Sequence, residues 1–289
     1  LNVSPDATVI NSFPTVFQTV SSQGTLTLAA DADNPTAGLM VMGTEGAVFS
    51  KGKFTATKED FIIDKVRVVH NDAAAESTDE VVNVVLEYTN SEGNTETVSK
   101  AIVGANADFT GLDILVPKDD SAVVTVKADL NTEASGADNA ATFGLDLYKA
   151  GAFRATGQAS GEVLATAAGS NVTGTTQTIY KSIPTVAFDS TTPSGSLTPA
   201  ANTLLAVVSV TADAGEDITF QQAGTDSITF TVNTSEAWAD GYDTYTLKDG
   251  DGTTLDSYLG DLGTTTDTVV FDFTDAALTV PASQTKLIK

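Results

Sequence analysis

Residues 248–254 contain the side chains best suited to bind a metal. They read Lys-Asp-Gly-Asp-Gly-Thr-Thr. Oxygen ligands on alternate residues can converge on one hard cation while glycine permits the sharp turn, so the pattern predicts a calcium site with Asp249, Asp251 and Asp256 as ligands. The glutamate that closes a twelve-residue calcium loop is absent. The Asp251-Gly252 pair is also typical of a β-hairpin turn, and both alternatives stay open.

A second candidate is a loop that combines aromatic and acidic residues. Residues 236–243 read Glu-Ala-Trp-Ala-Asp-Gly-Tyr-Asp and include Trp238, the chain's one tryptophan. Flat aromatic rings with a polar edge are suited to contact sugars, so Trp238 and Tyr242 are candidates for glycan contact. The alternative is that Trp238 closes the end of a β-sandwich.

Catalytic constellations are missing from the sequence. His70 is the one histidine, so a Ser-His-Asp triad would have to use it. It follows a predicted strand and precedes Asn71-Asp72, where we expect a solvated loop histidine. The chain has no cysteine and no Gly-x-Ser-x-Gly nucleophile turn. Paired carboxylates are available, but they lack the aromatic platforms of sugar-cleaving sites, and we expect a protein that is not an enzyme.

The charge balance limits the possible partners. There are 14 Lys and Arg residues against 38 Asp and Glu residues, which gives a formal net charge of −24. A nucleic-acid partner is excluded because its phosphates would be repelled. The acidic surplus fits cation binding, an extracellular habitat or solubility. No apolar run approaches the roughly 20 residues of a membrane helix, so no membrane span is predicted.

Period-two alternation of apolar and polar residues predicts the fold class. Stretches of this kind recur between Gly, Asn, Asp and Pro clusters, as at 25–28, 65–69, 122–128, 227–232 and 268–273. No convincing helical periodicity accompanies them. The sequence predicts an all-β protein of tandem immunoglobulin-like antiparallel β-sandwich domains.

Internal repetition supports a duplicated unit. Residues 108–117 return at 272–281, residues 12–16 at 182–186, residues 24–27 at 195–198, and residues 54–60 at 210–217 with one insertion. The order is kept while the offsets drift, as expected of duplicated domains. The repeat also sets residues 90–94 opposite the Asp251 loop, which favours the hairpin there.

The repeat predicts three segments. Residues 1–23 form an N-terminal arm or linker strand, residues 24–181 a first β-sandwich with extra strands over 132–181, and residues 182–289 a second β-sandwich. We expect the second unit to lack its final strands, because Val280-Pro281 is followed by eight residues alone.

The arm has apolar side chains at Val3, Val9 and Val16 and resembles the segment that joins the two copies. An extended segment can add a strand to an open sheet edge, so these residues are candidates for assembly with a neighbouring molecule. The alternative is that the segment is the first strand of its own domain.

Residues 54–60, 153–157, 181–186 and 272–273 carry a resemblance to a wider group. The chain is similar to large secreted β-repeat surface proteins of prokaryotes, in particular those of uncultured small-genome bacteria. The resemblance implies a filament, surface-layer or adhesin role and carries over no catalytic residue.

Together these features predict a non-enzymatic structural subunit of an extracellular filament or surface layer. It would self-associate through sandwich edges, with calcium as a possible ligand. Two alternatives are an adhesin or carbohydrate-binding region that contacts a glycan or host surface, and a viral tail or capsid protein.

Overall fold

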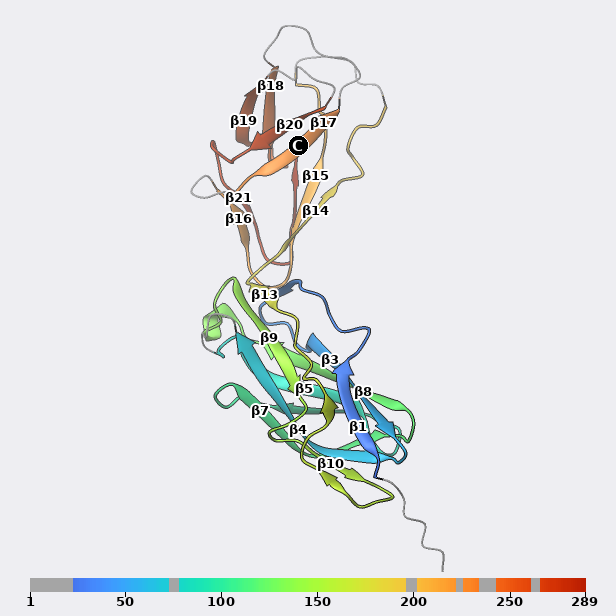
Figure 1. Cartoon of the computed structure of the whole chain (residues 1–289). Helices are drawn as coiled ribbons and strands as arrows, with labels where there is room; N and C mark the ends of the chain where they lie inside the picture. Colours follow the sequence, from blue (N-terminus) through green and yellow to red (C-terminus); the bar gives the residue numbers. More distant parts are fainter. Residues whose placement is uncertain (1–22, 73–77, 196–201, 222–225, 234–242, 261–265) are drawn as a thin grey trace, which may run out of the picture.

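The computed structural model describes residues 23–72, 78–195, 202–221, 226–233, 243–260 and 266–289, and its regular elements are almost all strands (Figure 1). In these ranges the one helical element is the 3₁₀ turn η1 (Glu133–Ser135). The prediction of an all-β protein is confirmed. Over the same residues, no helix has the length and apolar character needed to cross a membrane.

Residues 23–181, called the first half below, form a β-sandwich of two sheets. One sheet has six strands, in the order β12 (Ala168–Gly169), β1 (Thr25–Ala30), β3 (Ala47–Thr57), β8 (Ser121–Leu130), β5 (Val81–Thr89) and β6 (Thr95–Lys100). The other has the order β11 (Val163–Leu164), β10 (Arg154–Gly157), β4 (Phe61–Asp72), β9 (Ala141–Tyr148), β13 (Gln177–Tyr180) and β2 (Leu39–Val41), and β7 (Asn106–Val116) also pairs with β4.

Strand β4 is paired along both of its edges. Arg67 lies opposite Asp108 of β7 and also opposite Tyr148 of β9, so these two strands lie on opposite sides of β4. The strands expected beyond residue 132 are therefore part of the first sandwich's own sheet. Because both edges are paired, the main-chain donors and acceptors of β4 are satisfied by neighbouring strands.

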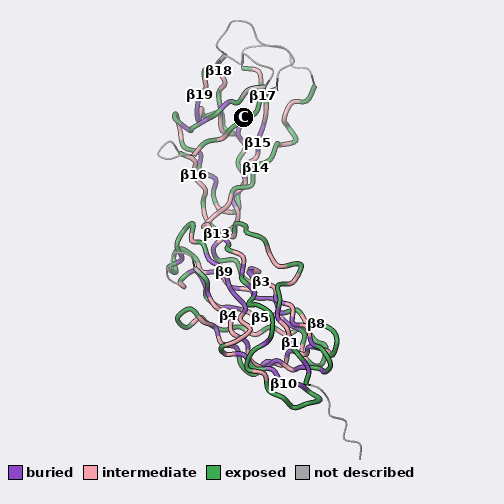
Figure 2. Tube along the Cα trace, viewed as in Figure 1, coloured by how far each residue is buried: buried purple, intermediate pink, exposed green. Residues whose placement is uncertain are grey.

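The core of the first half lies between its two sheets, where Figure 2 shows a high density of buried chain. Buried residues alternate with more exposed ones along most of β3 and β5, as the period-two pattern predicts. The ring of Phe143 on β9 stacks on Phe49 of β3 at a centroid distance of 4.8 Å and on His70 of β4 at 4.7 Å. Strand β9 thus joins β3 and β4 through one aromatic cluster.

A bulge changes which residues of β7 face the core. Ala107 and Phe109 are buried before it, and Leu112 and Ile114 are buried after it. The pairing with β4 shifts register between Ile63 and Lys65. Gly111 has φ of +75°, a conformation that favours glycine and is typical of a bulge.

Residues 182–289, the second half, have smaller sheets. One is β14 (Pro184–Phe188), β15 (Val208–Ala212) and β22 (Thr285–Ile288). The two-stranded pairs are β16 (Ile218–Phe220) with β21 (Leu278–Val280), β17 (Ile228–Asn233) with β20 (Thr266–Phe271), and β18 (Asp243–Lys248) with β19 (Thr254–Gly260). A separate hydrophobic core runs from Val208 to Ile288. This half lies beyond the end of β13 in Figure 1.

The two halves use the same strand registers. Residues 61, 62 and 63 lie opposite 116, 115 and 114, and residues 218, 219 and 220 lie opposite 280, 279 and 278. Thr55 faces Ser121 as Thr211 faces Thr285. These pairings follow the offsets of the repeat, which are 156 before its insertion (211 − 55), 157 after it (218 − 61) and 164 in the later segment (280 − 116 and 285 − 121). By these registers β3, β4, β7 and β8 correspond to β15, β16–β17, β20–β21 and β22.

One detail of the sequence repeat is corrected by the structure. Strand β1 pairs with β3, and the strand that pairs with β15 in the matching register is β14. Residues 184–188 therefore correspond to residues 26–30, and Gly195 does not correspond to Gly24. The repeat at residues 12–16 lies outside the described residues. The match of residues 24–27 with residues 195–198 was wrong because short glycine-containing matches are frequent in the turns of β proteins.

The Phe49 ring tests the packing of the first half. Phe49→Ala removes a fully buried ring from a three-ring stack, and we expect the free energy of unfolding to fall by about 3–5 kcal/mol in urea titrations followed by circular dichroism. Phe188→Ala is the matched control, because Phe188 is 71% exposed, and its effect should stay within about 0.5 kcal/mol. Equal losses from the two variants would contradict this core.

Candidate functional site

Five predicted site residues lie outside the described residues. They are the glycan candidates Trp238 and Tyr242 and the assembly candidates Val3, Val9 and Val16. Their roles stay predictions. The predicted calcium ligands Asp249, Asp251 and Asp256 are all described.

The Asp249 segment is a hairpin turn between β18 and β19. The Oδ1 atom of Asp249 accepts the Thr253 N–H at 2.8 Å, and Gly252 has φ of +93°. The β5–β6 hairpin has the same turn, in which the Oδ1 atom of Asn90 accepts the Asn94 N–H at 2.9 Å. The carboxylate of Asp249 therefore stabilises a turn, as the amide of Asn90 does.

Asp256 is buried and its carboxylate also binds main-chain donors. It accepts the N–H groups of Asp272 at 2.5 Å and Ser257 at 2.8 Å and the hydroxyl of Thr274. Burial raises the pKa of Asp256. The hydrogen bonds from Thr274 and from the two N–H groups together lower it by more, so the pKa lies below its usual range.

The structure does not gather the three aspartates into a calcium site. Among the described residues, no group of three His, Cys, Asp or Glu side chains is placed to hold a metal ion. The sequence pattern was misleading because spacing alone does not say where a carboxylate points. Here the oxygens of Asp249 and Asp256 are used by nearby main-chain donors.

The expectation of a solvated His70 is wrong. The residue belongs to β4, is buried, and packs against the Phe143 ring. Strand β4 continues to Asp72, beyond the point where the polar Asn71-Asp72 pair indicated a loop. His70 lies opposite Leu145 of the neighbouring strand β9, which is 75 residues later in the chain. The local sequence around His70 gives no sign of that pairing.

Glu59 is a buried carboxylate that sequence reasoning missed. Its two oxygens accept the N–H of Gly24 at 2.8 Å, the N–H of Ser160 at 2.8 Å and that of Ala159 at 3.1 Å. Burial raises the pKa of Glu59, and the hydrogen bonds, that from Gly24 first, bring it below its usual range. Glu59 thus ties the start of β1 to a loop 100 residues away.

The neighbouring acid keeps one role in both halves. Asp60 accepts the N–H of Lys118 at 2.6 Å, and Asp217 accepts the N–H of Ala282 at 2.8 Å. The signal for these carboxylates was present in the sequence, because Glu59-Asp60 belongs to the repeated segment. The repeat marked them as a shared structural feature without showing their partners.

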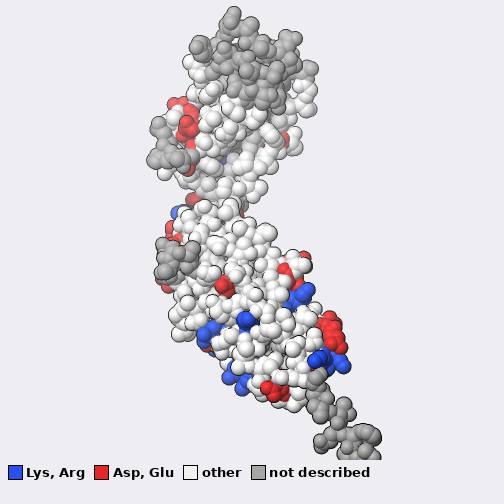
Figure 3. All heavy atoms as spheres, in the orientation of Figure 1, with Lys and Arg blue, Asp and Glu red and all other residues white. Residues whose placement is uncertain are grey.

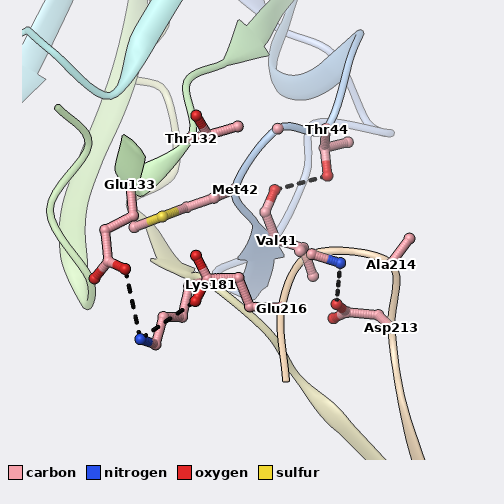
Figure 4. A pocket seen from close by; sticks show the side chains of 11 residues that line it. Val41, Met42, Thr44, Thr132, Glu133, Lys181, Asp213, Ala214 and Glu216 are labelled. Atoms are coloured by element: carbon pink, nitrogen blue, oxygen red, sulfur yellow. Dashed lines mark hydrogen bonds and ion pairs between the residues drawn. The ribbon is translucent and has the colours of Figure 1, made fainter. Parts of the chain in front are cut away.

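A cavity with a volume of about 560 Å³ lies where the two halves meet (Figure 4). Lys181 projects between Glu133 of the first half and Glu216 of the second, with Nζ–Oε2 distances of 3.5 and 3.4 Å. The interaction with Glu216, and then that with Glu133, raises the pKa of Lys181. All three side chains are about half exposed, and such ion pairs contribute little to stability.

Hydrogen bonds and close packing also shape the start of the second half at this junction. The Asp213 carboxylate accepts the Ile183 N–H at 2.7 Å and the Ser182 hydroxyl at 3.0 Å. A Cβ atom added to Gly215 would lie 2.1 Å from the carbonyl oxygen of Lys181 and 2.9 Å from the Val41 side chain. Only glycine permits this close approach of the two halves, so a larger residue at position 215 would displace them.

Strand β14 is the most exposed strand of the described chain. All five of its residues are exposed, including Val186 at 52% and Phe188 at 71%. Its counterpart β1 has Leu26 and Leu28 in the core and pairs with β12 on its outer edge. Within the described ranges β14 pairs with β15 alone. Exposed apolar strand edges are templates for pairing with another chain.

The second half also has few basic residues. Its basic residues are Lys248, Lys286 and Lys289. On the face that Figure 3 shows, the basic side chains gather over the first half, and the described part of the second half presents uncharged and acidic side chains. Lysines protect strand edges from pairing, and β14 carries none.

Comparisons with known proteins do not assign the chain to a family. No protein-family model and no curated protein matches it. Among solved structures it is similar to a family 123 glycoside hydrolase from Clostridium perfringens, at 7% identity and a TM-score of 0.26, over 54% of this chain and 27% of that one. The chain thus spans about a quarter of that structure, and a similarity of this size carries no argument about function.

Gly215 tests the junction. We expect Gly215→Val to force the halves apart, because the added atoms meet the Lys181 carbonyl, and small-angle X-ray scattering should show a changed distance distribution. Gly250→Val is the control, since a Cβ atom there meets its nearest neighbour at 3.6 Å. Identical scattering from the Gly215 variant and the native protein would contradict the described contact.

Asp256 tests the use of carboxylates as main-chain acceptors. Because its folded pKa is lowered, the ionised form stabilises the fold above about pH 4, and this contribution is lost as the pH falls through the folded pKa. Asp256→Asn should therefore lower the melting temperature at pH 7, and the difference from the native protein should shrink below about pH 4. Asp251→Asn, in the exposed part of the same hairpin, should change neither quantity. A pH-independent difference for Asp256→Asn would overturn this role.

Proposed function

We propose that this chain is a non-enzymatic structural subunit of an extracellular filament or surface layer. In this proposal it consists of two immunoglobulin-like β-sandwiches that polymerise through sheet edges, with strand donation by the N-terminal arm. The observation that most directly supports this proposal is the exposed apolar edge strand β14. In the described chain it pairs on one side alone.

The shared registers of the two halves support a repeated architecture. A repeated unit needs few specific contacts to continue an array, because the next copy can present the same surfaces again. The end-to-end placement of the halves in Figure 1 gives an elongated subunit. Contacts between different surfaces of successive copies that do not close into a ring produce a filament.

The placement of the acidic side chains also supports a structural role. Asp60, Asp217, Asp249 and Asp256 bind main-chain donors of turns and strand ends. Their oxygens maintain the fold and do not converge on a common point. The extracellular location rests on the resemblance to secreted surface proteins.

Imaging of purified full-length protein tests this function. We expect fibres or sheets by negative-stain electron microscopy. Because the net charge of −24 makes copies repel one another, assembly should increase as salt rises from about 0.01 M to about 0.15 M, where the screening length falls from about 30 to about 8 Å. A monodisperse monomer in light scattering at high protein concentration and 0.15 M salt would contradict it.

A further inference from the structure

The second half has an open strand position that the first half fills. Strand β4 pairs with β7 on one edge and with β9 on the other. Its counterpart β17 pairs with β20, and among the residues that the structure describes no strand lies along its other edge. Main-chain groups on a strand edge without such a neighbour can pair with another strand.

An apolar groove marks the same position. It has a volume of about 200 Å³ and is lined by residues of three strands, which are Val186, Ala187, Phe188, Val208, Ile228, Thr229 and Phe230. By the shared registers, Val186, Val208 and Ile228 correspond to Leu28, Gly52 and Val68.

In the first half, those three counterparts surround a side chain of β9. Leu147 lies opposite Val68, and its Cδ2 atom is 2.4 Å from the position of a Cβ atom built on Gly52, with Leu28 close by. Phe230 corresponds to His70, which stacks on Phe143 of β9. The groove of the second half is thus the place where β9 packs in the first half, left uncovered by the described chain.

The chain itself contains a segment suited to this edge. Residues 8–16 read Thr-Val-Ile-Asn-Ser-Phe-Pro-Thr-Val, and residues 178–186 read Thr-Ile-Tyr-Lys-Ser-Ile-Pro-Thr-Val without a gap. The second of these begins in β13, whose Ile179 is fully buried, and runs through the junction into β14. Residues 8–10 are therefore similar in sequence to the part of β13 that belongs to the same sheet as β4 and β9.

The direction of the strands explains why the donor belongs to another copy. Strand β9 is antiparallel to both β4 and β13, so β13 runs in the direction of β4 and leaves the sandwich where the second half begins (Figure 1). A donor strand in this direction beside β17 leaves the second half at the end away from the first. The first half of the donating copy then lies beyond the second half of the accepting copy. Within one chain, the second half lies beyond β13 in the same way.

From these observations we propose that the groove between β14 and β17 is an acceptor site for an extended strand, donated by residues 7–10 of a second copy of this chain. In this site Val9 lies beside β17, in the position that β9 has beside β4 in the first half. The inference rests on the proposed function, because it names the contact through which the subunits polymerise.

A disulfide trap tests this contact in the full chain, which has no cysteine of its own. Val9→Cys and Val186→Cys are made as separate proteins and mixed under mild oxidation. We expect a mixed disulfide dimer, since Val186 is half exposed on the groove wall. Val163→Cys, exposed in the first half, replaces Val186→Cys as the control and should give at least about tenfold less mixed dimer, a factor that corresponds to about 1.4 kcal/mol.

The outcomes separate this inference from the proposed function. If fibres form but no mixed disulfide appears, the acceptor site is overturned and polymerisation stands. If a protein that carries both cysteines forms the disulfide only within one molecule, the groove is occupied by the chain's own arm. The proposal of a donor from a second copy is then overturned. If neither assembly nor mixed dimer forms, both proposals fall.

A charge in the groove gives an independent readout. Val186→Glu places a carboxylate where an apolar side chain should dock, and we expect the concentration needed for assembly to rise about tenfold or more. Leu259→Glu, an exposed residue of β19 in the same half, should leave it unchanged. Circular dichroism of both variants should match the native protein, and an unchanged assembly threshold for Val186→Glu would overturn the site.

Discussion

The structure depends on one constraint, that each strand edge needs a partner for its main-chain donors and acceptors. In the first half β4 meets this requirement twice, through β7 and β9, and the sandwich closes around Phe49 and Phe143. In the second half, β17 has one such partner among the described strands, β20. The proposed polymer and its acceptor groove both follow from this difference between two otherwise matching halves.

The many acidic residues are in part explained by the same constraint at the ends of strands. Turns leave N–H groups without a strand partner, and a carboxylate oxygen is a strong acceptor for them. Glu59, Asp60, Asp217 and Asp249 all act in this way, and the pKa values of Glu59 and Asp249 are lowered by those hydrogen bonds against the opposing effect of burial. A chain with few basic residues thus stabilises its carboxylates with main-chain donors. Arg67 with Asp108 is an exception, a two-pronged ion pair across β4 and β7.

The junction shows how two such units can follow one another. Strand β13 is the last strand of the first half along the chain, and β14, the first strand of the second half, begins four residues after it. Asp213 binds the intervening Ser182 and Ile183, and Gly215 allows the second half to approach the carbonyl of Lys181. A short linker, a carboxylate and a glycine therefore set the contact, and a similar sequence, Asn-Ser-Phe-Pro, occurs before β1 at residues 11–14.

The sequence by itself determined the features that arise from local order. Period-two alternation predicted the strands, the repeat indicated related segments that turn out to share registers in β4–β7 and β16–β21, and Asp251-Gly252 with its counterpart at Gly93 favoured the hairpin. Only the tertiary structure decided that His70 is buried, that Glu59 binds three main-chain donors and that Asp256 faces β20 rather than a cation. It also placed β14 in the position of β1. The physical reason is that strand pairing joins residues far apart in the chain, and the partner that comes to lie beside a side chain leaves no mark in its neighbouring sequence.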